Sequence, residues 1–547
     1  MIESIELTCG PTHVSDPVKW NQRPGLTIFV GPNNSGKSAL LDDLYNWWPT
    51  RGSTKRSSLN DVQLTPFQPS MFEEHPKFRG SNDKDSIVHS GTNATRAMWA
   101  HQFERYWGDH EAREFRLDLS IWMNGTNRLD MLTDETDADL QSPTTPLARL
   151  LADDDRRAEF QAAVFSGLNH FPIVDWITEY GTLNLAFSPD KPDVKVEKSF
   201  TPEMQEYLAQ SNLSSRASSG FKAYTGILGT LYATDYKLIL IDEPEAFLHP
   251  PLARTLGKQV AEQAKDRHVF VATHSADFLM GAVDSGASVR VVRLQYQDGV
   301  ATACMLDSED LKQFMTDPLL RSSNVLSGLF AQSVIVAEAD TDRNFYQEIN
   351  NRLLAEGDGR GIENAVFLNA HEKSTVPRIV AMLRKMGVPT AGIVDVDVVA
   401  DRSGAWTNQL RAVGIPSSMH SELSCERKTI LHNMKENSSD PTGKSYKNEG
   451  AIDLLSNGEL KAARSWLREL ANFGLFVVPI GELEHWLPEL EVREKGRPWL
   501  GKIFSKMGSD PKAPDYIHPA KGDVWDFIAD CNAWLTNPAR QGMGGVE

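Results

Sequence analysis

Gly31-Pro32-Asn33-Asn34-Ser35-Gly36-Lys37-Ser38 matches the phosphate-binding pattern GxxxxGK[ST] at every fixed position. The apolar residues 26–30 before it predict a buried strand and residues 39–44 after it predict a helix, which is the context that the pattern requires. In such a loop, backbone N–H groups and the helix N-terminus face phosphates, while the lysine neutralises them and the serine enters a Mg²⁺ shell. The residues expected to bind ATP are Gly31, Asn34, Gly36, Lys37 and Ser38.

A second apolar run, Leu238-Ile239-Leu240-Ile241, ends in the acidic pair Asp242-Glu243. Such a run is typical of a buried parallel strand that delivers polar groups at its C-terminal edge. We expect Asp242 to complete the Mg²⁺ shell and Glu243 to orient or activate the attacking water, because phosphoryl transfer needs positioning and charge stabilisation. A strand over 268–272 ends in Thr273-His274-Ser275, where His274 would sense the γ-phosphate. Hydrolysis of ATP is therefore predicted, and not binding alone.

These motifs resemble those of ABC-type ATPases, specifically the DNA-repair and defence branch with DEPExxLHP and THS motifs. Ala217-Ser218-Ser219-Gly220-Phe221 lies where that family carries its signature segment, which reaches the nucleotide held by a second subunit. The resemblance implies that Ser218 and Gly220 complete the partner's ATP site and that dimerisation belongs to the catalytic cycle. The usual Gly-Gly-Gln ending is absent, and the alternative role for Ser218 is a helix cap.

Composition indicates a globular, cytosolic chain of several domains. It has 547 residues, 40% of them hydrophobic, and a net charge of −18, which argues against binding nucleic acid by bulk attraction. No apolar run reaches the ~18 residues of a membrane span, and the first residues lack the pattern of a signal peptide, so we expect no membrane partner. The four cysteines are far apart, which favours reduced thiols over disulfides or a zinc site.

The region between the phosphate loop and the signature segment is less regular. Residues 50–90 and 130–146 are rich in turn-forming and charged residues, whereas 147–165 has a helical pattern. We expect the helical insertion of the ATPase, and a dimerisation element, at roughly 50–210, without a coiled coil because no heptad pattern is sustained. Gln102 is the only candidate for a glutamine that senses the γ-phosphate.

Acidic residues also follow two predicted strands in the C-terminal third. Glu338 follows the strand at 333–337, and Asp395-Val396-Asp397 follows the run 391–394. Because two βα units of this kind make the strands parallel neighbours, these acids are expected to converge at one edge of a sheet. Asp395 and Asp397 would project from the same side, since strand side chains alternate. Convergent carboxylates repel unless a divalent ion joins them, which predicts Mg²⁺ or Mn²⁺; the alternative is that these acids only cap helices.

This second arrangement resembles the Toprim domain of topoisomerases, primases and OLD-family (overcoming lysogenization defect) nucleases. In that family a glutamate after the first strand and a later DxD bind metal, although here Ala339 replaces the usual glycine after Glu338. The resemblance implies a further acid, Glu482 or Glu484 after the strand at 475–479, and a lysine that stabilises developing charge. The remaining candidates are Asp342 as a metal ligand or helix cap, and Lys521 as the lysine with Lys512 in reserve.

The best local candidate for a polyanion contact is Arg493 to Lys521. Basic side chains outnumber acidic ones there by seven to three, and Trp499 and Phe504 lie among them as candidate stacking faces. The alternative is a solvated basic surface.

The order of the two domains predicts an α/β protein: an ABC-type P-loop ATPase domain with a helical insertion over 1–330, then a Toprim-like parallel α/β domain over 331–547. This order resembles OLD-family ATPase-nucleases of anti-phage systems. The resemblance implies an ATP-regulated, Mg²⁺-dependent DNA endonuclease or nickase, working as a homodimer or larger assembly, with room for a partner protein of a defence system. Two alternatives stay open: a Toprim nuclease that cuts RNA such as tRNA, and an ATPase sensor or scaffold that holds a separate effector.

Overall fold

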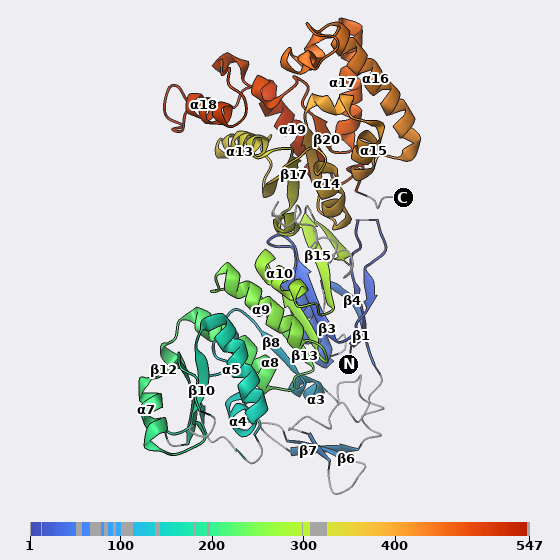
Figure 1. Ribbon diagram of the computed structural model, residues 1–547. Coiled ribbons are helices and arrows are strands. Elements are labelled where there is room, and N and C mark those ends of the chain that lie inside the picture. The colour runs from blue at the N-terminus through green and yellow to red at the C-terminus, as the bar shows by residue number, and fades with distance from the viewer. Residues whose placement is uncertain are drawn as a thin grey trace. The chain divides into compact units, whose positions relative to one another are not determined.

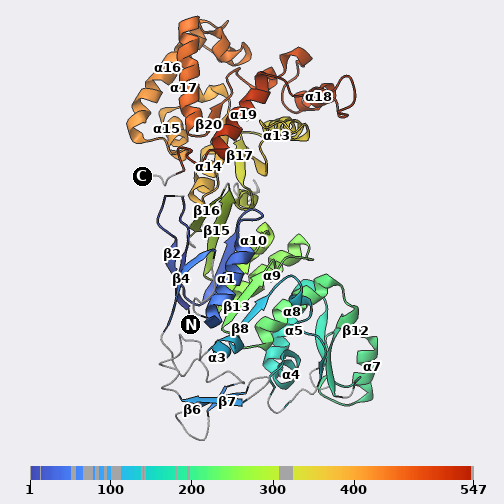
Figure 2. The same ribbon diagram turned by 180° about the vertical axis from the view of Figure 1, so that it is seen from behind.

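The computed structural model describes residues 2–306 and 325–543, except 13, 51–56, 66–77, 81–85, 91–94, 100–112, 137–139, 141–142, 180, 194–196 and 298. The chain divides into two compact units, Met1–Met315 and Thr316–Glu547. Figures 1 and 2 show both units from opposite sides. Among the described helices, none is long and apolar enough to cross a membrane.

The first unit is built on a six-stranded sheet with the order β16-β15-β3-β14-β13-β8. Its strands are β3 (Gly25–Val30), β8 (Ser120–Met123), β13 (Leu238–Asp242), β14 (His268–Ala272), β15 (Val289–Gln297) and β16 (Val300–Leu306). All neighbours pair in parallel except β15 and β16. The strands predicted at 26–30, 238–241 and 268–272 are confirmed, and β14 lies between the other two. The phosphate loop, the acidic pair and the THS segment therefore leave three adjacent strands at one edge.

One face of this sheet packs against α1 (Lys37–Thr50) and a small antiparallel sheet of order β2-β1-β4. The small sheet consists of β1 (Ile2–Leu7), β2 (Lys19–Asn21) and β4 (Leu59–Leu64). Helices α8 (Ser219–Ala233), α9 (Pro250–Gln263) and α10 (Ala276–Asp284) lie on the other side, as Figures 1 and 2 show. The alternating residues of β3 are buried on both faces, which explains why its sequence is continuously apolar.

The predicted insertion is a mixed lobe rather than a purely helical one. Antiparallel strands β9 (Glu135–Thr136), β10 (Phe171–Asp175), β11 (Thr182–Ser188) and β12 (Asn212–Leu213) pack with α4 (Pro146–Ala152), α5 (Asp154–Leu168) and α7 (Pro202–Gln210). Asp153 divides the predicted helix 147–165 in two, because its carboxylate accepts the N–H groups of Asp155 and Arg156 and so caps α5. Strands β4 and β8, also inside 50–210, return to the sheets of the ATPase core.

The chain between β4 and β8 also contains short elements, two of which, β5 (Phe78–Gly80) and β6 (Ser86–Ser90), lie in the stretch 50–90 for which the sequence predicts loops. Together with β7 (Thr95–Trp99) they form an antiparallel sheet, and α3 (Arg113–Asp118) follows. Gln102, the candidate sensor of the γ-phosphate, lies outside the described residues.

The second unit contains a parallel sheet of order β18-β17-β19-β20. Its strands are β17 (Ser333–Ala337), β18 (Ala365–Asn369), β19 (Thr390–Val394) and β20 (Leu475–Val477). The crossovers include α13 (Asp340–Ala355) and α14 (Val376–Lys385). Strand order and direction confirm the expectation that β17 and β19 are parallel neighbours.

The described residues of this unit also include the α-helices α15 (Ser403–Ala412), α16 (His420–Glu436), α17 (Asn457–Asn472), α18 (Arg497–Met507) and α19 (Asp523–Thr536). Trp499 of α18 is 0% exposed, and its ring centroid lies 5.1 Å from that of Phe345. The prediction that Trp499 is a stacking face is therefore wrong, because this side chain anchors α18 to the core. Phe504 is partly buried against the same core.

Candidate functional sites

The phosphate loop joins β3 to α1 with its lysine folded inward. Lys37 Nζ donates to Gly31 O at 3.0 Å, to Pro32 O at 2.8 Å and to Ser35 Oγ at 3.2 Å. Burial lowers the pKa of Lys37 to about 8, although Asp242 and Glu243 oppose that shift. The backbone also needs glycine at the start of the loop, since Gly31 has φ +144° and a Cβ there would lie 2.0 Å from Leu294 O.

The acidic pair meets the loop as the sequence predicts. Ser38 Oγ donates to Asp242 Oδ1 at 3.1 Å, which joins two residues that are far apart in the chain. These two oxygens are the ligand types that Mg²⁺ takes beside phosphates. His274 Nε2 lies 4.0 Å from Glu243 Oε1, and burial together with the charge of Lys37 lowers the pKa of His274. The lowered pKa favours the neutral imidazole of His274.

A buried arginine that the sequence does not single out, Arg128, hydrogen-bonds to the backbone of Asp242 and Glu243. Arg128 is 0% exposed and its Nη1 donates to Asp242 O at 2.8 Å and also to Glu243 O. Glu243 has φ +50°, a conformation that costs free energy in a residue other than glycine. The two hydrogen bonds hold that strained backbone in place. No sequence signal marks Arg128, because it lies in the short 3-10 helix η3 (Asn127–Leu129) far from either motif.

Replacing Arg128 with methionine should lower kcat for ATP hydrolysis by about 10–100-fold and leave KM for ATP within about twofold. The reason is that Glu243 loses its backbone support while the phosphate loop keeps all its contacts. Steady-state ATPase kinetics measure both constants, and Arg254→Met on the exposed side of α9 is the matched control. Equal losses in kcat and in nucleotide affinity would show that Arg128 serves the fold and not Glu243.

Glu245 ties the acidic motif to the THS segment. Thr273 Oγ1 donates to Glu245 Oε2 at 2.8 Å, and His274 N donates to Glu245 Oε1 at 2.7 Å. The second glutamate of the DEPE motif therefore positions the histidine that faces Glu243. His249, at the end of the same motif, caps α9 by accepting from Leu252 N.

The signature segment starts α8. Ser218 Oγ accepts from Phe221 N at 3.4 Å, so the helix-cap role considered for Ser218 is what the described residues show. A Cβ on Gly220 would lie 2.8 Å from Phe247 O, so this glycine allows close approach of the loop that follows the acidic motif. A contact of Ser218 and Gly220 with a second subunit stays a prediction.

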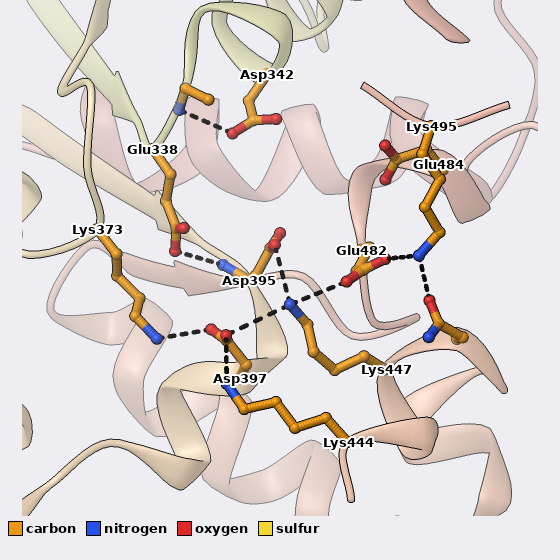
Figure 3. A network of polar contacts seen from close by, with 12 residues as sticks. Glu338, Asp342, Lys373, Asp395, Asp397, Lys444, Lys447, Glu482, Glu484 and Lys495 are labelled. Carbon is orange, nitrogen blue, oxygen red and sulfur yellow. Dashed lines mark hydrogen bonds and ion pairs between the residues drawn. The ribbon is translucent and has the colours of Figure 1, made fainter. Parts of the chain in front are cut away.

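In the second unit, acids follow three neighbouring strands at one edge of the sheet (Figure 3). Glu338 follows β17, and its Oε1 accepts from Asp395 N at 2.9 Å. The prediction that Asp395 and Asp397 project from one side of a strand is wrong, because β19 ends at Val394 and Asp397 lies in the 3-10 helix η6 (Val396–Ala400). The turn of that helix, not strand alternation, brings the two carboxylates together.

One lysine joins the acids. Lys447 Nζ lies 3.7 Å from Asp395 Oδ2, 3.4 Å from Asp397 Oδ2 and 3.0 Å from Glu482 Oε1. Glu482 therefore lies with Asp395 and Asp397, and its role as the further acid stays a prediction. Glu484 instead accepts from Gly496 N at 2.8 Å, and Asp342 accepts from Ala339 N at 2.9 Å at the start of α13.

Three further lysines surround this cluster, which we call the carboxylate cluster: Glu338, Asp395, Asp397 and Glu482. Lys373 Nζ lies 2.7 Å from Asp397 Oδ1, Lys444 Nζ lies 3.5 Å from Asp397 Oδ2, and Lys495 Nζ lies 2.7 Å from Glu482 Oε2. Lys521 and Lys512, the lysines chosen from the sequence, are exposed and make no ion pair with the carboxylate cluster within the described ranges. The geometry favours Lys447 for the lysine role.

Burial and mutual repulsion shift the pKa values of the acids in and beside the carboxylate cluster. Burial and the charge of Asp395 raise the pKa of Glu338 to about 8, and burial raises that of Asp395 to about 7. Burial also acts on Asp397, but the hydrogen bond from Lys373 and the charge of Lys447 outweigh it and lower the pKa. Burial raises the pKa of Asp342 to about 6, with a further contribution from Glu484.

The donor set fits a hard divalent cation, because it consists of carboxylates, three of which already surround the ammonium of Lys447. Within the described ranges, however, no three acidic, histidine or cysteine side chains are close enough together to hold a metal ion as they stand. The ammonium of Lys447 lies between them, so Lys447 has to give up contacts before these acids can hold a metal ion.

Gly481 sets the position of Lys447. It has φ +111°, and a Cβ there would lie 2.0 Å from Lys447 O, in the 3-10 helix η8 (Ser445–Asn448). The segment after β20 and the segment carrying Lys447 therefore touch backbone to backbone.

Gly481→Ala should lower activity that depends on the carboxylate cluster by about 100-fold, because the added methyl group displaces Lys447 by an ångström or more. Gly458→Ala in the first turn of α17 is the control, since a Cβ there meets nothing within 4 Å. Metal-dependent cleavage of nucleic acid measures the effect, and thermal unfolding of both variants separates it from loss of the fold. Undiminished cleavage in Gly481→Ala would contradict this role of the close approach.

Each of the two units contains a region that matches a known protein family. Residues 54–281 match the family described as "AAA domain, putative AbiEii toxin, Type IV TA system". Residues 329–397 match the "Overcoming lysogenization defect protein-like, TOPRIM domain". Endonuclease GajA of Bacillus cereus (strain VD045) is 24% identical over 150 residues, which cover 27% of this chain and only 25% of that relative.

Two solved structures are similar to part of the chain. The Smc head bound to the C-winged helix domain of ScpA is 16% identical with a TM-score of 0.34, covering 57% of this chain and 99% of that one. The SMC head domain from Thermotoga maritima is 12% identical with a TM-score of 0.29, covering 56% and 99%. On its two domain matches, the chain is an enzyme that joins an AAA-type ATPase domain to a Toprim domain of the overcoming-lysogenization-defect kind, domains that use a nucleotide and a divalent metal ion.

Proposed function

We propose that the chain is an ATP-regulated, Mg²⁺-dependent DNA endonuclease or nickase of the OLD type that acts in anti-phage defence. The observation that carries this proposal is the convergence of Asp395, Asp397 and Glu482 on the single ammonium of Lys447, at the edge of a parallel sheet. These acids lie close together although like charges repel. Such a set suits a site where cations meet a polyanion.

A bound Mg²⁺ or Mn²⁺ would supply Lewis-acid stabilisation of the attacking and leaving oxygens of a phosphodiester. Glu338, Asp395, Asp397 and Glu482 are the residues that would hold it. Lys447 is 13% exposed at its side chain, and the surrounding carboxylates outweigh the effect of burial and raise its pKa, so it stays charged. A charged lysine that stays beside the site after giving up these contacts to a metal ion would stabilise the negative charge that develops on the phosphate.

The ATPase unit would control access to that site. In the proposed mechanism, Asp242 and Ser38 hold Mg²⁺, Glu243 activates water and His274 senses the γ-phosphate. Ser218 and Gly220 would face the nucleotide of a second copy, so that ATP joins two subunits and hydrolysis releases them.

A cleavage assay on the full chain tests the proposal. Supercoiled plasmid and bulk tRNA are incubated with Mg²⁺, with Mn²⁺ or with EDTA, each with and without ATP. We expect nicked or linear plasmid only with a divalent ion. Cutting of tRNA alone would move the substrate to RNA, and no cutting of either, together with no calorimetric signal for Mn²⁺ binding, would favour a scaffold for a separate effector. Plating of phage on cells with the intact gene and with Asp397→Asn tests the defence role.

A further inference from the structure

A groove of about 630 Å³ runs between α14 and α15, outside the carboxylate cluster. Its lining residues recur at helical spacing, with Ser374, Pro377 and Ala381 on the side of α14 and Arg402, Ala405 and Ala412 on the side of α15. The groove therefore follows the helices rather than crossing them. The ten residues of α15 span about 15 Å, which is enough to follow several phosphates of one strand.

The groove is basic. Lys373, Arg378, Arg402 and Arg411 line it, against the single acid Asp401. Arg402 and Arg411 are exposed and form no ion pair with any residue that the structure describes. In a chain with a net charge of −18, such a local excess of guanidinium groups favours an anionic ligand at this place.

The lining of the groove suits recognition of a ligand by its shape and charge rather than by its bases. It includes small apolar side chains such as Ala381 and Ala405, and none of its described lining residues is aromatic. Binding of bases by single-strand binding proteins depends on aromatic stacking, which this groove does not offer.

One residue connects the groove to the carboxylate cluster. The ion pair between Lys373 and Asp397, with Nζ 2.7 Å from Oδ1, is drawn in Figure 3. Lys373 Nζ also lies 2.7 Å from Oδ1 of Asp401, which lines the groove, so Lys373 belongs to both. We propose that the groove between α14 and α15 binds the sugar–phosphate backbone of the nucleic-acid strand that is cut at the carboxylate cluster, without regard to sequence. This inference rests on the proposed function for its substrate, and it adds the path that the strand takes.

Binding measured apart from cutting tests the groove. A labelled oligonucleotide of about 20 nucleotides, single-stranded or duplex, is titrated with the full chain in EDTA and in Ca²⁺. Its fluorescence anisotropy gives the binding constant K over a range of salt concentrations. The variant is Arg378→Gln/Arg402→Gln/Arg411→Gln, and the matched control is Lys461→Gln/Arg464→Gln/Arg468→Gln on the exposed face of α17. We expect the groove variant to weaken binding by about 10–100-fold and to lower the slope of log K against log salt by about 2, since each lost phosphate contact contributes about 0.7.

Each outcome decides the point. The groove assignment is overturned if the wild-type chain binds no oligonucleotide in either buffer, if both variants weaken equally, or if the groove variant binds as the wild type does. Calorimetry with a mononucleotide gives a further outcome. If the mononucleotide binds the wild type but not the groove variant, while the affinity for the oligonucleotide is the same in both, the groove binds a small ligand and not a strand. Cutting is scored separately: groove-dependent binding without any cleavage contradicts the proposed function alone, whereas cleavage and binding that ignore the groove contradict this inference alone.

Discussion

Replacing Asp397 with asparagine should lower phosphodiester cleavage by about 10³-fold while ATP turnover stays within about twofold of the wild type. The asparagine keeps the size of the side chain but removes the charge that faces Lys373 and Lys447, at 2.7 and 3.4 Å. A site that depends on carboxylates to hold a divalent ion loses several kcal/mol of stabilisation with one of them, and 4 kcal/mol corresponds to roughly a thousandfold.

Plasmid nicking and phosphate release from ATP, measured on the same preparation, give the two rates. Asp453→Asn is the matched control, since Asp453 is an exposed acid of the same unit. Cleavage at the wild-type rate in Asp397→Asn would remove the carboxylate cluster from the reaction. A parallel loss of ATP turnover would mean that the substitution disturbs the whole chain rather than one site.

Glu243→Gln should lower the rate of ATP turnover by about 10²–10⁴-fold, which is the usual contribution of a general base to the rate, and should leave ATP affinity unchanged. Glutamine cannot accept the proton of water, but Lys37, Ser38 and Asp242 keep the groups that hold the phosphates and Mg²⁺. Single-turnover hydrolysis and binding of a fluorescent ATP analogue measure the two quantities.

Glu206→Gln on the exposed side of α7 serves as the control for Glu243→Gln. Residual hydrolysis above a tenth of the wild-type rate would show that another group activates the water. The same variant holds the chain in its ATP-bound state, so its cleavage rate relative to the wild type tells whether ATP drives or restrains the second unit.

Local signals explain what the sequence predicted well. The strands before the phosphate loop, before Asp242 and before Glu338 each combine a continuous apolar run with a polar exit, a pattern typical of buried parallel strands. Parallel pairing of β17 with β19 then brings Glu338 and Asp395 to one edge without any long-range information.

Tertiary contacts explain what the sequence could not give. Lys447 lies in a short 3-10 helix between two long helices, where no periodicity distinguishes it from Lys444 or from Lys521. Arg128 contacts the acidic pair only because the fold brings it next to residues more than a hundred positions away in the chain. Trp499 has the composition of a surface motif around it, yet its burial depends on Phe345 across the core. In each case the neighbour that decides the role is remote in sequence.

The backbone contact between Gly481 and Lys447 has an evolutionary consequence. A mutation that adds a side chain at position 481 is tolerated only when the 445–448 turn shifts or changes length in the same lineage, so the two positions should vary together among homologous sequences. Under the proposed function, homologues that have lost cleavage would be free of this restriction, and we expect bulky residues at position 481 among them.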